Sequence, residues 1–470
     1  MSNNRMLLTV AVSVVVLLAS LALVARRPPT GLAAAATLTP QPINMPSFPV
    51  PSPTIDGWIN SNNQTAIRQH AWDLWAGINS ITPASQGWPI WETWYSDTEV
   101  LNGPPAHPLN AKFRAVRATR RPVHRLTKPR QFEHQKSAQL FAPPLAAATA
   151  AAEPVVVSVK ANVDYAQFVW SNNYYKPAVL WNIEKNWPPS TAAVNRMIKP
   201  FPAPAIGLKP VFQVVRGPQN NGGITVLPYW LGDLTTGPTH STTPTHPTPG
   251  TWNQCVVVKT GSAAPPPNLT CQDSTAKPTG IVGVNQFYNF ALNAAEVATM
   301  CGSVSPTNCP IKVGDYAVLV GMHMTTKEDD NWTWQTFWWN YNQPFPYGAP
   351  PANIPAPFNN YAMCTAYSMT VDPVNSVSGK NVLCYNPYLE TSRNIPDGVH
   401  SNCMSCHSVA SYGSNPNTNY PASYTSPNNY ISPLLATDGT PYFNCQTQTD
   451  FSWLLADSTG SQPPLPACTP

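Results

Sequence analysis

The chain has 470 residues and a formal net charge of +4, with 55 Pro, 10% aromatic residues and only 10% charged residues. This aromatic content excludes a chain that stays disordered, because disordered chains lack apolar side chains to bury. The proline content excludes a bundle of long helices, since proline removes a helical hydrogen bond and clashes with the preceding turn. We expect an α+β fold with a loop-rich, β-rich body and a sizeable core.

An apolar run at residues 6–25, with arginines on both sides, begins the chain. About twenty apolar residues can span a bilayer, and the small residues that follow also offer a cleavage site. We therefore predict that residues 1–36 form a signal peptide or a membrane anchor. The Pro-rich stretch at 37–54 is predicted to be an extended tether.

Residues 55–390 are predicted to form the β-rich body. A helix is expected after Asn63, where apolar residues recur at helical spacing. Further short helices are expected at 163–172 and near 292–300. Apolar runs predict strands at 155–159, 210–215, 224–230, 255–259 and 280–290.

A basic and Ala/Pro-rich insert at 112–154 interrupts this body. Nine Lys and Arg residues fall between 112 and 136, opposed only by Glu133. We expect a long surface excursion, because Ala and Pro runs between periodic segments are typical of loops. A basic patch can bind nucleic acid, but an exported chain makes a nucleic-acid partner unexpected.

Two apolar runs, at 316–324 and 331–339, are separated by an acidic turn at 328–330. Both runs are predicted to be strands that pair as a hairpin. Because side chains alternate along a strand, His323 must face away from the methionine on either side of it.

The pentapeptide Cys403-Met404-Ser405-Cys406-His407 carries the C-x-x-C-H spacing that is typical of c-type haem attachment. Both cysteine sulfurs would form thioethers, and His407 would bind the iron from one side. With ten Cys and nine His in the chain, this pattern is expected by chance roughly 0.004 times. A disulfide or another metal site beside a histidine is the alternative interpretation.

Residues 391–470 are therefore predicted to be a short helical c-type haem segment packed against the body. Its helix is expected to begin near Ser401 or Asn402, either of which can cap it. The implied cofactor is one covalent haem with its iron. Haem c is attached outside the cytoplasm, so the body should lie on the periplasmic or extracellular side, with or without an anchor in the inner membrane.

The eight remaining cysteines are an even number, which fits disulfides in an oxidising compartment. Pairing between sequence neighbours is the simplest of many possible connectivities. It predicts the bridges Cys255–Cys271, Cys301–Cys309, Cys364–Cys384 and Cys445–Cys468.

The second axial position of the iron has no candidate ligand downstream, because no Met, His or Lys follows His407. The iron is then either five-coordinate or bound by a residue from upstream. His323 is the favoured distal candidate, since a polar ring within an apolar strand needs a partner. The other candidates are Met322, Met324, Met363, Met369 and His400.

Several stretches give the chain a resemblance to exported bacterial proteins of the cytochrome c family. These stretches are residues 91–95, 323–328, 332–337, 385–390, 401–407 and 450–453. The resemblance extends over residues 60–457, apart from the basic insert. It implies a protein with a single haem whose β-rich body belongs with its haem segment, and it supplies no substrate.

The leading functional hypothesis is one-electron transfer by an exported c-type cytochrome rather than catalysis. A haem enzyme acting on peroxide or another small ligand is the first alternative, with His323 or Glu328 as proton donor. An aromatic-rich ligand-binding module carrying a haem is the second. The segment after Arg393 has four Asp and no Lys or Arg, so we expect a redox partner with a basic docking face.

Overall fold

The structure is a computed structural model of the chain. It describes residues 37–127, 155–186, 197–230, 252–272, 274–302, 308–341, 345, 348–367, 384, 386–390, 403–407, 410–413 and 446–456. The apolar run at 6–25 lies outside these ranges. Within them, no helix is both long enough and apolar enough to cross a membrane.

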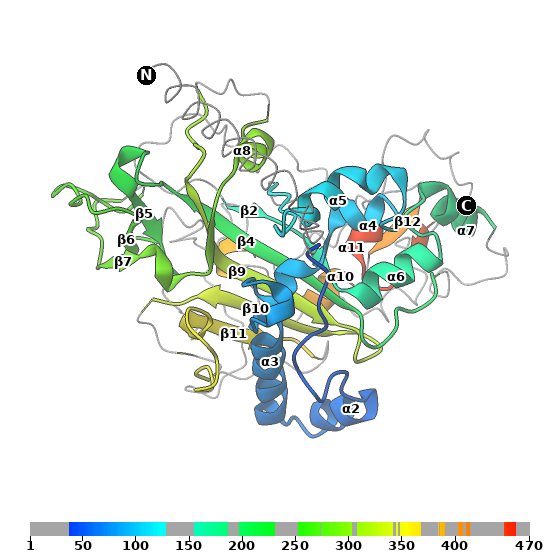
Figure 1. The fold of residues 1–470 in the computed structure, drawn as a ribbon. Coiled ribbons are helices and arrows are strands. Elements are labelled where there is room, and N and C mark those ends of the chain that lie inside the picture. Colours follow the sequence, from blue (N-terminus) through cyan, green and yellow to red (C-terminus); the bar gives the residue numbers. More distant parts are fainter. Residues whose placement is uncertain are drawn as a thin grey trace, which may run out of the picture.

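An antiparallel, eight-stranded sheet forms the centre of the body (Figure 1). Its strand order is β1-β3-β4-β9-β10-β11, with β2 paired to β4 and β8 paired to β9. The predicted hairpin is confirmed as β9 and β10, which pair antiparallel. The strands are β1 (Tyr95–Ser96), β2 (Val156–Val157), β3 (Lys160–Ala161), β4 (Ile206–Val215), β8 (Asn289–Ala291), β9 (Tyr316–Thr326), β10 (Thr333–Trp339) and β11 (Tyr361–Thr365).

Two smaller sheets flank the central one. The first contains β5 (Ile224–Pro228), β6 (Cys255–Lys259) and β7 (Ile281–Gly283), and the second pairs β12 (Ser411–Gly413) with β13 (Gln446–Gln448). Together with the helices, they confirm the coarse prediction of an α+β fold with a β-rich body.

The described helices are short, as the proline content predicts. They are α2 (Ser52–Asn60), α3 (Gln64–Asn79), α4 (Asp97–Leu101), α5 (Ala111–Ala118), α6 (Val163–Ser171), α7 (Pro177–Lys185), α8 (Ala294–Cys301), α9 (Pro387–Glu390), α10 (Cys403–His407) and α11 (Trp453–Ala456). The side chain of Asn63 caps α3 by accepting a hydrogen bond from the Ala66 amide. The helix expected after Asn63 is confirmed.

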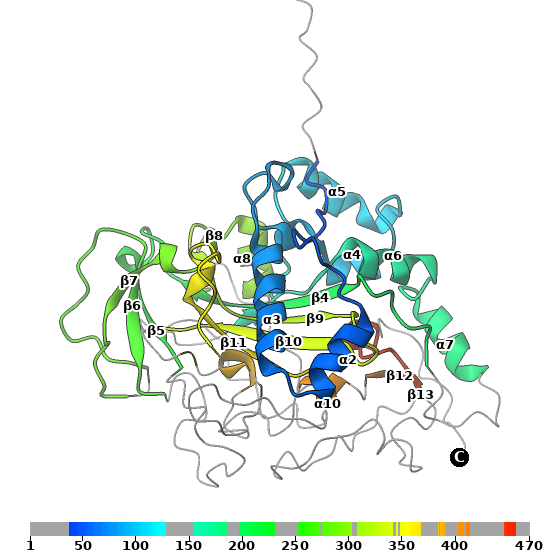
Figure 2. The ribbon, with the colours of Figure 1, turned by 90° about the horizontal axis from the view of Figure 1, so that it is seen from below.

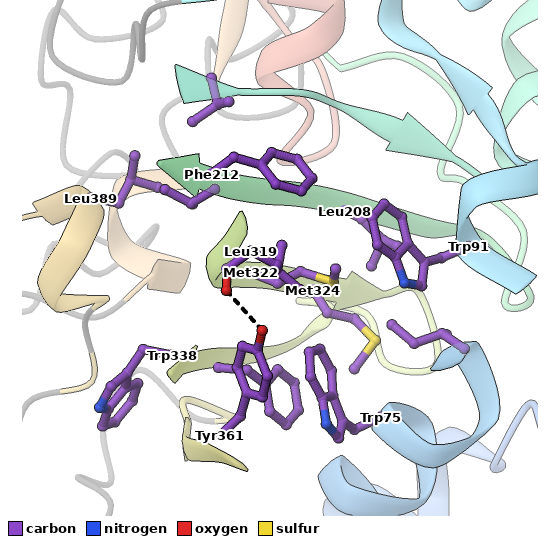
Figure 3. Close-up of a cluster of buried hydrophobic side chains, with 14 of the residues drawn as sticks. Trp75, Trp91, Leu208, Phe212, Leu319, Met322, Met324, Trp338, Tyr361 and Leu389 are labelled. Carbon is purple, nitrogen blue, oxygen red and sulfur yellow. Dashed lines mark hydrogen bonds between the residues drawn. The ribbon is translucent and has the colours of Figure 1, made fainter. Parts of the chain in front are cut away.

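The central sheet has an N-terminal face, which we define by Phe337, Met322 and Met324. These three residues point to the same side because directly paired residues of neighbouring strands do so. Helix α3 crosses this face (Figure 2), and the Trp75 ring stacks on Phe337 with a centroid distance of 4.1 Å. Figure 3 shows both methionines inside this buried cluster. The cluster is the main core of the body.

The opposite side is the C-terminal face, which we define by His323, Thr325, Trp334 and Thr336. The Asn386 side chain, just before α9, donates a hydrogen bond of 2.9 Å to the Thr336 hydroxyl. Segments that are late in the sequence therefore cover this face.

Residues 37–50 pack on the body, unlike the extended tether predicted for 37–54. The Leu38 side chain is fully buried, and the Val50 amide donates a hydrogen bond of 2.7 Å to Glu328. Backbone amides of this Pro-rich stretch donate hydrogen bonds to side chains of the body, to Thr93 from Gln41 and to Glu328 from Val50. The final residues of the predicted tether begin α2.

Part of the predicted basic surface excursion is also buried. The Arg117 guanidinium forms an ion pair of 2.6 Å with Glu99, and both side chains are almost inaccessible. Partners from elsewhere in the chain neutralise these cations, which a count of local charge cannot reveal. Residues 128–154 lie outside the described part of the chain.

Three of the four predicted disulfides are present: Cys255–Cys271, Cys301–Cys309 and Cys364–Cys384. The fourth predicted pair, Cys445–Cys468, lies outside the described residues. Bridges between sequence neighbours close short loops, and each typically stabilises a fold by about 2–4 kcal/mol.

Candidate functional site

The His407 ring lies at the end of α10 and is held on two sides. Its Nδ1 lies 2.8 Å from the carbonyl oxygen of Phe451. Its ring centroid lies 4.3 Å from that of Trp334, on the C-terminal face of β10. A carbonyl can only accept a hydrogen bond, so Nδ1 carries the proton, and in the neutral ring Nε2 carries the lone pair.

A tight turn at Thr449–Ser452 supplies that carbonyl. Asp450 has a φ of 49° and Phe451 a φ of 66°. Two successive non-glycine residues in the left-handed region are uncommon and need support from their surroundings. The Ser452 amide donates to the Thr449 carbonyl at 3.0 Å, and the hydroxyls of Ser452 and Tyr165 lie 2.5 Å apart. The body therefore fixes the turn that faces His407.

Cys403 and Met404, at the start of the pentapeptide, are buried. The Cys403 sulfur lies 3.9 Å from the carbonyl oxygen of Cys384. Cys384 is bridged to Cys364 on β11, so this disulfide ties the surroundings of the pentapeptide to the central sheet. The side chain of Cys406 lies outside the described residues.

His323 lies on the same C-terminal face as Trp334. It is paired with Thr336, two residues along β10 from Trp334. Its Nε2 lies 3.3 Å from a carboxylate oxygen of Glu390 in α9, and its side chain is 19% exposed. The polar partner expected for this ring is thus present, and it is a carboxylate.

The other distal candidates do not share this position. Met322 and Met324 lie on the N-terminal face, and Met363 joins them because it pairs with Phe337. All three are buried in the core. Since Trp334 and His407 meet on the opposite face, these methionines point away from the pentapeptide. Met369 and His400 lie outside the described residues.

Glu328, the alternative proton donor, is also directed away from His407. It accepts a hydrogen bond from the Thr326 hydroxyl at 2.6 Å and faces His70 of α3 at 3.3 Å. Thr326 has the same parity along β9 as Met324, so these contacts belong to the N-terminal side of the sheet. Although it belongs to the acidic turn between the two strands, Glu328 is buried by these partners.

The tryptophan-rich strand β10 does not form a surface platform. Its Trp334, Trp338 and Trp339 are all buried, as is Trp332 just before the strand. Both faces of β10 are covered, by α3 on one side and by the late segments on the other. The aromatic-rich binding surface considered from the sequence is therefore not found at this strand.

A second group of buried ionisable side chains surrounds His124. Its Nδ1 lies 2.9 Å from Glu296 and its Nε2 lies 3.0 Å from Glu92. Burial alone would lower the pKa of His124, but the two carboxylates outweigh it and raise that pKa. Burial likewise opposes ionisation of Glu92, but His124 and Lys160 lower its pKa to about 2. The group joins residues from both halves of the body and is an internal ion network.

Gly321 offers a direct test of how the C-terminal face is covered. A Cβ at this position would lie 2.6 Å from the side-chain nitrogen of Asn386, which is held by Thr336 and by the Phe337 carbonyl. We expect Gly321→Ala to displace the segment around α9 and to destabilise the protein by about 1–3 kcal/mol. The measurement is the midpoint of urea unfolding.

Gly207→Ala is the matched control, on the neighbouring strand and the same face. Its Cβ would come no closer than 3.4 Å to another atom, the Thr325 methyl group. This variant should unfold near the wild-type midpoint. Equal losses in the two variants would contradict the proposed packing of the Asn386 segment.

The residues present fit a covalent c-type haem in one clear respect. The hydrogen bond from Nδ1 of His407 fixes the ring so that Nε2 is the nitrogen able to bind iron. Within the described residues, no group of three or more His, Cys, Asp and Glu side chains could hold a bare metal ion. A covalent haem does not need such a group, because the pentapeptide itself would supply two cysteine sulfurs for the thioethers and one imidazole for the iron.

Comparisons with protein-family models, curated protein sequences and solved structures gave no match. The family resemblance noted in the sequence therefore stays a prediction. The functional argument depends on the residues of this chain alone.

Proposed function

We propose that the chain is an exported c-type cytochrome with one covalent haem that transfers single electrons. Cys403 and Cys406 would anchor the haem through thioethers, and His407 would bind its iron. When bound, the haem supplies an iron that changes between the ferric and ferrous states. The observation that carries the proposal is the 2.8 Å contact between Nδ1 of His407 and the Phe451 carbonyl, within a C-x-x-C-H pentapeptide.

The hydrogen bond to Phe451 has two chemical consequences for His407. It holds the imidazole in one tautomer and one orientation, and it makes Nε2 a more basic ligand. A more basic ligand stabilises ferric iron and lowers the reduction potential.

Aromatic side chains around His407 would tune the same potential. The rings of Trp334 and Trp453 have centroids 4.3 Å and 6.5 Å from that of His407. Such apolar surroundings limit access of water and favour the iron state of lower charge. The turn and the rings thus act in opposite directions on the reduction equilibrium.

Visible spectra of the oxidised and reduced protein, recorded with and without carbon monoxide, test the proposal. We expect the spectrum of a low-spin haem c in at least one oxidation state, and reversible reduction by a one-electron donor. A protein with no haem absorption after export through a working haem-attachment system would contradict it.

A haem enzyme acting on peroxide or another small ligand is the second candidate, favoured by the His323–Glu390 contact of 3.3 Å. A histidine beside a carboxylate on the C-terminal face has the composition of a proton-transfer pair. In the electron-transfer reading, His323 is instead the distal iron ligand. The two readings differ in the coordination number of the wild-type iron.

His323→Ala separates these roles. If His323 is the sixth ligand, the variant should change from a six-coordinate low-spin to a high-spin spectrum and bind carbon monoxide readily. If it is a proton donor, the wild type should already be five-coordinate and the variant should mainly slow a peroxide reaction. His107→Ala, outside this face, is the control. An unchanged spectrum, ligand affinity and reactivity in His323→Ala would exclude His323 from the site.

Export and a redox partner with a basic docking face remain parts of this proposal. The three disulfides are compatible with an oxidising compartment outside the cytoplasm. One of the four late aspartates, Asp450, is buried in an ion pair with Lys327 and cannot contribute to a docking field. Asp397, Asp438 and Asp457 lie outside the described residues. If they steer docking, the rate of partner reduction should fall as salt is added.

A further inference from the structure

We propose that the buried ion pair between Lys327 and Asp450 positions the axial imidazole of the haem. It does so by holding the turn whose carbonyl, at Phe451, faces His407. This inference rests on the proposed haem function and adds two positioning residues that the C-x-x-C-H spacing does not include.

Asp450 is bound by partners that come from the body. One of its carboxylate oxygens accepts a hydrogen bond of 2.9 Å from Lys327, which follows β9. The other accepts a hydrogen bond of 2.7 Å from the Phe201 amide, which precedes β4. The side chains of Lys327 and Asp450 are 7% and 2% exposed. Removing either charge would leave the other buried without its counterion, which is strongly unfavourable.

The backbone conformation of this turn is unfavourable and depends on contacts of this kind. Asp450 and Phe451 both have positive φ, at 49° and 66°. A left-handed conformation in a bulky residue such as phenylalanine costs roughly 1–3 kcal/mol and persists only where its surroundings impose it. The Asp450 carboxylate ties the turn to Lys327 directly after β9 and to Phe201 upstream of β4. It also accepts a longer hydrogen bond of 3.4 Å from the Trp332 ring nitrogen.

The contacts of Asp450 determine where the Phe451 carbonyl points. Its oxygen lies 2.8 Å from Nδ1 of His407, and no sequence neighbour of His407 supplies it. If the turn relaxed, this hydrogen bond would weaken and the imidazole would become a poorer donor to ferric iron. The reduction equilibrium would then move toward ferrous iron. The ion pair therefore acts on the iron through the orientation of one backbone carbonyl.

Two single variants separate positioning from simple electrostatics. Asp450→Asn removes the charge but keeps a residue that tolerates the left-handed conformation. Lys327→Met removes the opposite charge and retains most of the side-chain volume. A purely electrostatic effect would shift the midpoint potential up in Asp450→Asn and down in Lys327→Met. Loss of positioning raises the potential in both variants.

We expect each variant to move the reduction equilibrium toward ferrous haem by about three- to tenfold, or about 30–60 mV at 59 mV per tenfold for one electron. The electron paramagnetic resonance of the ferric haem should also show a changed axial field. The double variant should resemble the single ones, since either change breaks the same pair.

Glu99→Gln is the matched control. Glu99 forms a similarly buried ion pair with Arg117, with side-chain exposures of 4% and 7%. It should lower stability to a similar extent and leave the potential and the resonance unchanged. Opposite shifts in Asp450→Asn and Lys327→Met, or no shift in either, would overturn the positioning role. A wild-type protein without covalent haem would instead overturn the proposed function itself, and haem content is measured first in every sample.

Discussion

Replacing His407 with glycine is expected to remove low-spin haem from the exported protein. The imidazole is the proposed axial ligand, and its hydrogen bond to Phe451 is the contact that orients it. Because loss of outer-shell partners alone typically reduces metal affinity or activity about 10–100-fold, loss of the ligand itself should lower the yield of low-spin haem protein by at least about tenfold. The measurement is the visible spectrum per mole of chain.

Imidazole added to the His407→Gly protein provides the chemical control. It should enter the vacated space and restore a low-spin spectrum in whatever haem-bearing protein remains. His70→Gln changes another buried histidine, on helix α3, and should leave the haem spectrum intact. A normal low-spin spectrum in His407→Gly without imidazole would contradict the assignment of His407 as the ligand.

Of the variants proposed here, His124→Leu is expected to produce the largest loss of stability. The imidazolium ring separates Glu92 from Glu296 and bonds both carboxylates. Its removal leaves two buried negative charges with one counterion fewer, a change that typically destabilises a protein by about 3–5 kcal/mol. The midpoint of urea unfolding at neutral pH measures the loss. A midpoint within error of the wild type would show that the network contributes nothing net.

The same network predicts a pH optimum of stability. The pKa of His124 is raised above its usual 6.5, so its contribution is complete below pH 6.5 and is lost as the pH rises through the raised value. The pKa of Glu92 is lowered from 4.5 to about 2, so its contribution is complete above pH 4.5 and is lost as the pH falls toward 2. Other charged or titratable groups in the network are Glu296, Lys160, Arg121 and Tyr288.

We therefore expect the greatest stability between pH 4.5 and 6.5 and a decline on both sides. Burial lowers the pKa of Lys160 below its usual 10.5. This amine therefore opposes the alkaline decline only as the pH rises through that lowered value, where the unfolded chain binds more protons than the folded one. The alkaline part of the decline should be absent from His124→Leu and retained in His70→Gln. Identical pH profiles for His124→Leu and the wild type would contradict the imidazolium assignment.

Local patterns in the sequence predicted much of the fold. Apolar runs on both sides of an acidic turn identified β9 and β10, and helical spacing after Asn63 identified α3. Cysteine order identified three bridges, because each closes a short loop. These features depend on residues that are close together in the chain.

Long-range partners were the part that local patterns could not predict. Lys327 and Asp450 are 123 residues apart, and Arg117 looks like one more cation of a basic insert until Glu99 is placed beside it. The same limit applies to Glu328. An acidic turn suggests exposure to solvent, but Glu328 is buried by His70 of α3 and by the Val50 amide. Burial of a charge is decided by what packs on it, and that information is not local.

The candidate site also has features that the sequence could predict and features that it could not. The pentapeptide and the alternation that separates His323 from its methionine neighbours were readable from the sequence. The role of the Phe451 carbonyl was not, since a backbone oxygen leaves no residue-type signal. Two successive left-handed residues at Asp450 and Phe451 also carry no glycine that would mark the turn.

The mass of the exported chain after acid-acetone extraction tests the central claim most directly. Thioether bonds to Cys403 and Cys406 survive this treatment, whereas a haem held only through its iron is removed. We predict one haem adduct per chain, retained in full, and its absence from a Cys403→Ser, Cys406→Ser variant. A wild-type chain with the mass of the bare polypeptide, or an adduct lost on extraction, would contradict the proposal that this protein is a c-type cytochrome.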